Sequence, residues 1–83
     1  MNFFVYLIIA VIKNRKISYV GYTNDLNKRI KLHNSSKGAK FTKGKIWKLV
    51  YYKKFKTKSL AMKHEYFLKK NRKIRNMIKF NNL

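Results

Sequence analysis

The first and longest apolar stretch of the chain is unbroken. Residues 3–12, FFVYLIIAVI, carry only one polar group, the hydroxyl of Tyr6. A run this rich in β-branched and aromatic side chains predicts a central strand that is covered on both faces. It is about half as long as a membrane-spanning helix, and it lacks the basic start and the cleavage site of a signal peptide. We therefore expect a cytoplasmic protein, or a nuclear one in a eukaryote, that is not secreted and does not bind membranes.

Two shorter apolar blocks predict the other strands. Residues 16–21 follow a polar turn at residues 13–15, so they are expected to pair with the first strand in an antiparallel hairpin. Residues 46–55, IWKLVYYKKF, predict a third strand. Between the second and third strands, the Ser, Gly and Lys content of residues 34–45 indicates a loop, which is expected to contact backbone phosphates.

The stretches after the second and third strands predict helices. Thr23 or Asn24 can cap the first helix, and Asp25 then lies in its positive first turn. Thr57 or Ser59 opens the second helix. The three expected helices end near residues 34, 70 and 80, and the last, which begins at residue 72, ends in a frayed tail. The pattern as a whole predicts an α+β fold with a small three-stranded antiparallel sheet flanked by about three helices.

Composition adds a strong positive charge to this picture. Among 83 residues, 22 are Lys or Arg and 2 are Asp or Glu, which gives a formal net charge of +20. A field of this size favours a polyanion, with nucleic acid as the leading partner. An A/T-rich genome, which enriches Lys, Asn, Ile, Phe and Tyr, is an alternative source of part of the charge. The length allows one domain over residues 1–83, and the lack of cysteine excludes disulfides and thiolate metal sites.

The two carboxylates limit the chemistry. A two-metal nuclease site and a paired-carboxylate acid–base site each need several acids in one pocket, so both are nearly excluded. Asp25 is explained by the first turn of a helix. Glu65 lies between Ala61 and Leu68 on a helix face that also carries core residues. It must pair with a cation of the chain or bind a metal ion, and the spacing leaves both open.

Four further side chains form a pattern that plain surface charge does not explain. Arg29 and His33 are four residues apart, so they stand on one face of the first helix. Tyr6 and Tyr19 lie on adjacent predicted strands, where tyrosines are most often core residues. Combined with Glu65, these four residues could form a one-metal phosphodiesterase site.

These residues carry a resemblance to a known family. The segments Phe4-Val5-Tyr6 and Tyr19-Val20-Gly21, followed by Arg29, His33 and Glu65, resemble the small stand-alone branch of the GIY-YIG nuclease superfamily. In that superfamily, two tyrosine-bearing strands lead into a helix with Arg, and a later helix carries Glu. The likeness extends over about residues 3–79 and implies a nuclease module without a separate DNA-binding domain.

The resemblance also implies a role for each matching residue. Tyr6 and Tyr19 occupy the two tyrosine positions, and one of them would take the proton from the attacking water. Arg29 would bind the scissile phosphate, and His33 would assist in proton transfer or orient the water. Glu65 would hold one divalent cation, Mg²⁺ or Mn²⁺.

The chain departs from the family pattern in a few places. Phe4 replaces the glycine of the first triad, and Tyr22 stands where repair-type relatives place a lysine. Some members use a late helical asparagine, for which Asn71 and Asn76 are both available.

The expected function is a metal-dependent DNA endonuclease that is structure-directed or weakly sequence-specific and acts in DNA repair or recombination. It needs no small-molecule cofactor, and a protein partner could supply specificity. Two alternatives stay open: a basic nucleic-acid-binding module with this fold and little or no turnover, and a membrane- or RNA-associating protein whose motif is coincidental. The residues expected to contact DNA are Lys37, Lys40, Lys43, Lys45 and Arg29.

Overall fold

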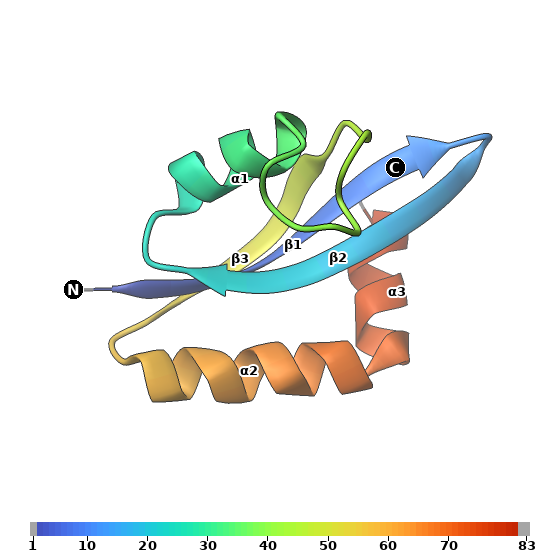
Figure 1. Ribbon diagram of the computed structural model, residues 1–83. Helices are drawn as coiled ribbons and strands as arrows, with labels where there is room; N and C mark the ends of the chain where they lie inside the picture. Colours follow the sequence, from blue (N-terminus) through green and yellow to red (C-terminus); the bar gives the residue numbers. More distant parts are fainter. Residues whose placement is uncertain (1, 82–83) are drawn as a thin grey trace.

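The unbroken apolar run forms the middle strand of a sheet in the computed structural model, which describes residues 2–81 (Figure 1). Strand β1 (Phe3–Ile12) pairs antiparallel with β2 (Arg15–Thr23) on one side and with β3 (Lys48–Phe55) on the other. Within the described residues the strand order is β2-β1-β3. The α+β fold and the small antiparallel sheet expected from the sequence are confirmed.

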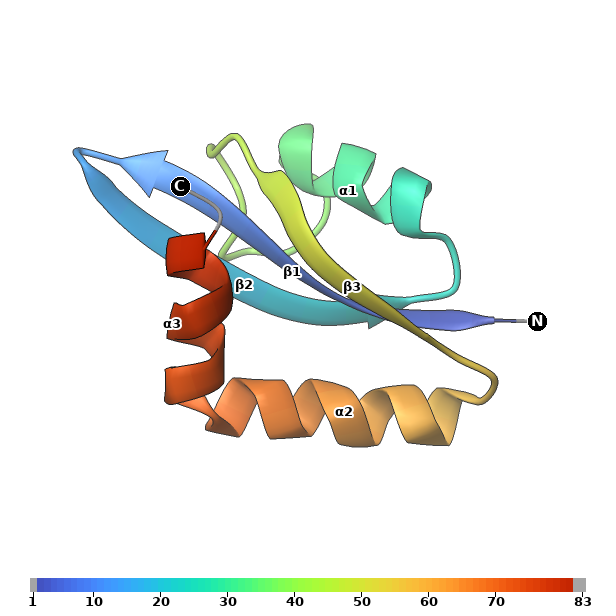
Figure 2. The same cartoon turned by 180° about the vertical axis from the view of Figure 1, so that it is seen from behind.

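The hairpin between β1 and β2 closes through two residues rather than the three expected. Lys13 and Asn14 have φ values of 50° and 66°, the left-handed conformation whose twist matches that of the flanking strands. Arg15 already belongs to β2, directly across from Ile12. Because β3 pairs with β1 only from Phe3 to Ile9, the tip of the hairpin extends past β3, as Figure 2 shows from behind.

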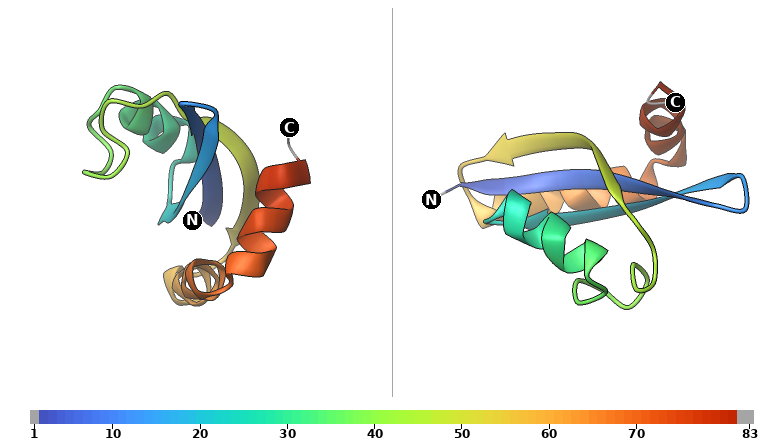
Figure 3. Two further views of the ribbon diagram at one scale, coloured as in Figure 1. Left: turned by 90° about the vertical axis from the view of Figure 1, so that its right-hand side faces the viewer. Right: turned by 90° about the horizontal axis from the view of Figure 1, so that it is seen from above.

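Both faces of β1 are covered, as the apolar run predicts. Val5, Leu7 and Ile9 point to one face, where they pack in a core that also contains residues of α2 (Lys58–Lys70) and α3 (Arg72–Asn81). Tyr6 and Ile8 point to the other face, which is covered by α1 (Leu26–Asn34) and by the loop at residues 35–47. The two helical layers stand on opposite sides of the sheet in Figure 3.

Each of the first two helices begins at a capping side chain. Asp25 is the N-cap of α1, where its carboxylate accepts from the backbone N–H of Lys28 at 3.2 Å, so the expectation that Thr23 or Asn24 caps this helix is wrong. The hydroxyl of Thr23 instead accepts from the backbone N–H of Asp25 and fixes the residue that caps. Of the two candidates for α2, Thr57 is the cap, through a hydrogen bond from the N–H of Leu60.

The third strand and the third helix also differ slightly from expectation. β3 starts at Lys48, two residues later than predicted, because Trp47 turns inward and is buried. Asn71 accepts from the N–H of Ile74 at the start of α3, so this asparagine has a capping role. Of the frayed tail expected after residue 80, Asn81 still belongs to α3, and residues 82–83 lie outside the described residues.

No helix among the described residues has the length and hydropathy needed to cross a bilayer.

Candidate active site

The two motif tyrosines point to the same face of the sheet. Tyr6 of β1 lies across from Gly21, and Tyr19 is two residues before Gly21 on β2, so strand alternation places both side chains on the α1 side. The phenol of Tyr6 lies over Gly21. A Cβ atom at position 21 would collide with the phenol oxygen and stand 2.6 Å from the ring carbon that bears it. The glycine of the second triad is therefore required by the tyrosine of the first.

His33 lies behind Tyr6 and is fully buried. Its Nε2 atom is 2.7 Å from the Tyr6 hydroxyl, and its Nδ1 atom is 2.8 Å from the hydroxyl of Thr42. The single proton of the Thr42 hydroxyl goes to the carbonyl oxygen of Ala39 at 2.9 Å. Thr42 must therefore accept a hydrogen bond from Nδ1–H of His33. We assign His33 the tautomer with Nδ1 protonated, so that Nε2 accepts from the Tyr6 hydroxyl.

Electrostatics keep this pair neutral. Burial raises the pKa of Tyr6 above 10, and the neighbouring guanidinium of Arg29 offsets part of that rise. Burial and, secondarily, the charge of Arg29 lower the pKa of His33 below 6.5. At neutral pH, His33 is thus a neutral acceptor that faces a protonated phenol.

Arg29 stands one helical turn before His33 and lines an open pocket of about 430 Å³ with Tyr6 and Tyr19. Its Nε atom is buried and has no hydrogen-bond partner among the described residues. An unpaired buried donor on a charged group is costly. A phosphate oxygen in the pocket would be a suitable acceptor, because guanidinium groups bind phosphate through paired N–H donors.

Glu65 reaches the same pocket from the opposite side of the sheet. It belongs to α2, which packs on the face away from α1, and the pocket lies at the edge strand β2 between the two layers. Its only ion-pair partner among the described residues is Lys69, 3.6 Å away and half exposed. The ion pair left open by the sequence is thus present, and its length leaves the carboxylate available to the pocket; binding of a metal ion stays a prediction.

The residues around Glu65 fit a lightly held divalent cation. No group of three or more His, Cys, Asp or Glu residues gathers anywhere in residues 2–81, so a cage of protein ligands is absent from that range. Mg²⁺ keeps most of its water and is often held by one or two carboxylates together with substrate phosphates. One carboxylate beside a phosphate-binding arginine matches that requirement.

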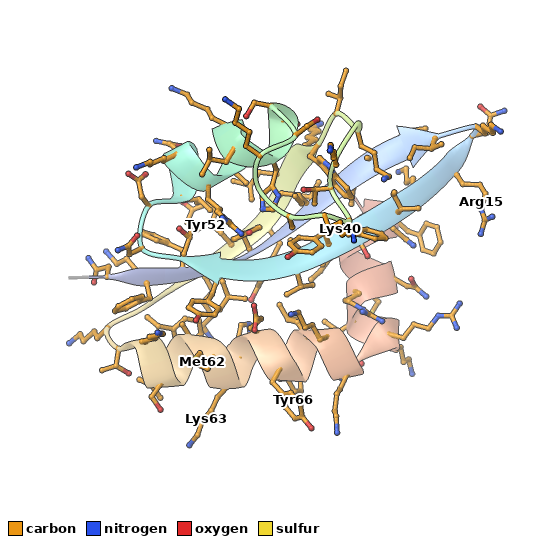
Figure 4. The ribbon with its side chains drawn as sticks, viewed as in Figure 1. Arg15, Lys40, Tyr52, Met62, Lys63 and Tyr66 are labelled. Atoms are coloured by element: carbon orange, nitrogen blue, oxygen red, sulfur yellow. The ribbon has the colours of Figure 1, made fainter. Side chains whose placement is uncertain are left out.

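The loop at residues 35–47 presents the expected basic residues unequally. Lys37, Lys40 and Lys43 are exposed, and Figure 4 shows Lys40 on the part of the loop beside β2. Lys45 is half-buried, and its ammonium group donates to the carbonyl oxygens of Phe41 and Lys43. Its charge therefore holds the loop together in addition to any contact with DNA.

The sequence reasoning missed two residues that support the site. Thr42 fixes the tautomer of His33, and Gly38 packs so closely on the imidazole that a Cβ atom would collide with Nδ1. Their signal in the sequence is the segment Gly38-Ala39-Lys40-Phe41-Thr42, which lies in a loop too polar to suggest a buried contact. Neither Asn71 nor Asn76 is among the residues that line the pocket.

Comparisons with known proteins show the family to which the chain belongs. A family model described as the GIY-YIG catalytic domain matches residues 2–78. UPF0213 protein YazA of Bacillus subtilis is 53% identical over 53 residues, which cover 63% of this chain and 54% of that protein. UPF0213 protein CPE1444 of Clostridium perfringens is 46% identical over 66 residues, which cover 78% of this chain and 70% of that protein. The match to the first relative thus spans about half of its length.

A solved structure is similar as well. The solution NMR structure of UPF0213 protein BH0048 from Bacillus halodurans is 38% identical to this chain. The superposition covers 93% of this chain and 80% of the other, with a TM-score of 0.51.

Proposed function

Because the chain belongs to the GIY-YIG catalytic domain family, a nuclease superfamily, we propose that it is a DNA endonuclease that hydrolyses phosphodiester bonds with the help of one divalent cation. The observation that carries the proposal is that Tyr6, Tyr19, Arg29 and Glu65 all line the same pocket. The guanidinium of Arg29 suits a bound phosphodiester, and the two tyrosine hydroxyls suit an attacking water. The carboxylate of Glu65 suits a cation. The net charge of +20 supplies attraction for the DNA backbone.

Arg29 binds the scissile phosphate. Its unpartnered Nε atom and the rest of the guanidinium fork offer parallel donors to two phosphate oxygens. Negative charge builds up on these oxygens as the water attacks, so the donors bind the transition state more tightly than the ground state.

Tyr6 and His33 form the route by which the water loses its proton. A tyrosine with a raised pKa is a poor base by itself, because the phenol is protonated at neutral pH. The Tyr6 hydroxyl donates to Nε2 of His33, so its oxygen is left to act as an acceptor, toward the guanidinium of Arg29 and toward water. As the water oxygen forms its bond to phosphorus, its proton passes to Tyr6 and the Tyr6 proton passes to His33. The phosphorus–oxygen bond to the leaving strand breaks, and the leaving oxygen takes a proton from solvent. His33, which is briefly an imidazolium, returns its proton through Tyr6 to water in the pocket.

Tyr19 has a different role in this scheme. No hydrogen bond to its hydroxyl is found among residues 2–81, and its ring packs edge-on against His33 with centroids 5.2 Å apart. Its hydroxyl is therefore available to orient the water from the second wall of the pocket. His33, which is buried and does not line the pocket, acts through Tyr6 as a positioning residue and proton acceptor.

Glu65 would hold the cation, Mg²⁺ or Mn²⁺. When bound, such an ion supplies charge stabilisation for the leaving oxygen and orients the phosphate. Its ion pair with Lys69 is long, 3.6 Å, and the Lys69 side chain is half exposed, so this pairing leaves the carboxylate oxygens accessible to a cation in the pocket.

The first test is a plasmid-nicking assay with Mg²⁺ and with EDTA. Arg29→Ala should lower the nicking rate about 100- to 1000-fold, the usual effect of removing one transition-state donor, while DNA binding changes by only a few-fold. Arg15→Ala is the matched control, because Arg15 is an exposed arginine at the hairpin tip, which Figure 4 labels. It begins β2, whereas the pocket is lined by residues at the other end of that strand. Equal nicking by the two variants would contradict the assignment of Arg29.

Glu65→Gln tests the cation site. The substitution keeps the size of the side chain and removes the negative charge, so Mg²⁺-dependent nicking should collapse. Asp25→Asn is the control, because it removes the same charge at a position where Asn caps a helix as well as Asp does. Nicking that survives in Glu65→Gln would refute the cation site.

A second candidate function is a DNA-binding module without turnover, which the wide spread of lysines favours. Both functions require an affinity for DNA that falls steeply as the salt concentration rises. They differ in the nicking assay, because a binding module shows no Mg²⁺-dependent cleavage in the wild-type protein.

A further inference from the structure

One aromatic side chain beside the pocket is exposed although its ring is fixed in place. Phe41 is 52% exposed, yet its ring stacks on Tyr19 with a centroid distance of 6.0 Å and an interplanar angle of 19°. It also contacts Trp47, whose ring centroid is 6.1 Å away. Because Tyr19 also lines the pocket, the exposed ring stands one side chain away from the phosphate site.

The loop that carries Phe41 is held in shape by internal hydrogen bonds. Asn34 and Trp47 exchange two of them across its base, at 2.6 and 3.1 Å. The indole N–H of Trp47 donates to the carbonyl oxygen of Thr42 at 3.0 Å, next to Phe41 in the chain. The loop therefore holds the Phe41 ring at the protein surface before any ligand binds. The exposed part of the ring costs hydrophobic free energy in the free protein.

The charge around this ring is suited to a nucleotide. The ammonium group of Lys45 lies over the Phe41 ring, 5.3 Å from its centroid, and the nearby Lys40 and Lys43 are exposed. An exposed aromatic ring among lysines is the arrangement that binds single-stranded nucleic acids. A base would take the place of the Lys45 ammonium group over the ring, and the lysines would bind the phosphates.

We propose that Phe41 is the stacking platform for an unpaired nucleobase next to the cleaved phosphate, so that the substrate is DNA with an unpaired nucleotide at the cut site. The inference rests on the proposed function and specifies its substrate. Bases inside an intact duplex are stacked on their neighbours and offer no free face to a protein ring. Single strands, bulges and flaps offer such a face beside a phosphate that Arg29 can reach.

The test measures binding in EDTA, so that its result does not depend on cleavage. The probes are a paired duplex and the same duplex with one unpaired 2-aminopurine, whose fluorescence falls when it stacks on an aromatic ring. The wild-type protein should bind the second probe about 5- to 100-fold more tightly and quench its fluorescence, the range expected for stacking one base.

Two variants isolate the ring. Phe41→Leu keeps an apolar cover over Tyr19 and Trp47 but cannot stack a base, so it should lose the preference and the quenching while its melting temperature stays near that of the wild type. Ile46→Ala is the control, because Ile46 lies in the same loop, is 86% exposed and should leave both signals unchanged.

The outcomes separate this inference from the proposed function. Equal binding of the two probes by the wild-type protein, or full preference and quenching in Phe41→Leu, would overturn the platform even if plasmid nicking succeeds. A preference that depends on Phe41 would support the platform even if no cleavage is found.

Discussion

The hydroxyl of Thr42 allows a sharp test of the network behind Tyr6. Thr42 is completely buried, and its oxygen makes three hydrogen bonds: with Nδ1 of His33 at 2.8 Å, with the N–H of Ala39 at 3.2 Å and with the carbonyl oxygen of Ala39 at 2.9 Å. Thr42→Val keeps the shape of the side chain and removes all three. No cavity forms, so the effect reports on hydrogen bonding alone.

The expected loss of stability follows from the groups left behind. Nδ1–H of His33 is buried and loses its only partner among the described residues, and an unsatisfied buried group costs about 1–3 kcal/mol. With the Ala39 bonds included, we expect Thr42→Val to lower the free energy of unfolding by about 2–4 kcal/mol. A domain of this size has a total of about 4–12 kcal/mol, so the melting temperature should fall on the order of 10–25 °C.

Chemical denaturation of Thr42→Val and Thr57→Val measures this loss. Thr57 is an exposed N-cap, for which loss of the hydroxyl costs about 1 kcal/mol. If Thr42→Val is no more destabilised than Thr57→Val, the Thr42 hydroxyl does not fix His33, and the tautomer assigned above is wrong.

Three other predictions concern the same surroundings. Gly21→Ala should cost about 1–3 kcal/mol in denaturant unfolding, because the added Cβ pushes the phenol of Tyr6 out of place; an unchanged midpoint would show that Tyr6 does not lie there. Glu65→Gln should change the unfolding free energy by less than about 0.5 kcal/mol, because its ion pair is 3.6 Å long and the Lys69 partner is half exposed to water, which weakens such pairs; a larger loss would indicate a structural ion pair. The pKa values of His33 and His64 are lowered in the fold, so the unfolded chain binds more protons below about pH 6.5, and stability that is present above that pH should be lost as the pH falls. Melting temperatures between pH 8 and 5 would show this decline, and it should be smaller in His64→Gln.

The sheet could be predicted from the sequence because its signals are local. The unbroken run at residues 3–12 indicates a strand buried on both faces, and its hairpin with residues 16–21 needs only a short turn. The helix caps were less certain, because Thr23, Asn24 and Asp25 are all good capping residues in a row. The choice of Asp25 depends on where β2 ends, which the pairing with β1 decides.

The candidate site was only partly predictable. Helical spacing places Arg29 and His33 on one face, but it does not reveal that His33 is sealed behind Tyr6 by a loop that returns nine residues later. Spacing likewise identifies Glu65 as unusual without showing that α2 brings it round the edge of β2. Both facts depend on tertiary packing between segments that are distant in sequence. The roles assigned to these residues stay predictions until the variants are measured.

The central place of β1 has a consequence for synthesis on the ribosome. Its first edge finds a partner as soon as β2 is made, whereas its second edge pairs with β3, which ends at Phe55. At a translation rate of about 5–20 residues per second, roughly 3–10 s pass between the appearance of Phe3 and that of Phe55. During that interval, the most apolar strand of the protein has an open edge that could pair with another nascent chain. The high positive charge makes unfinished chains repel one another, so it opposes aggregation while the chain is still growing.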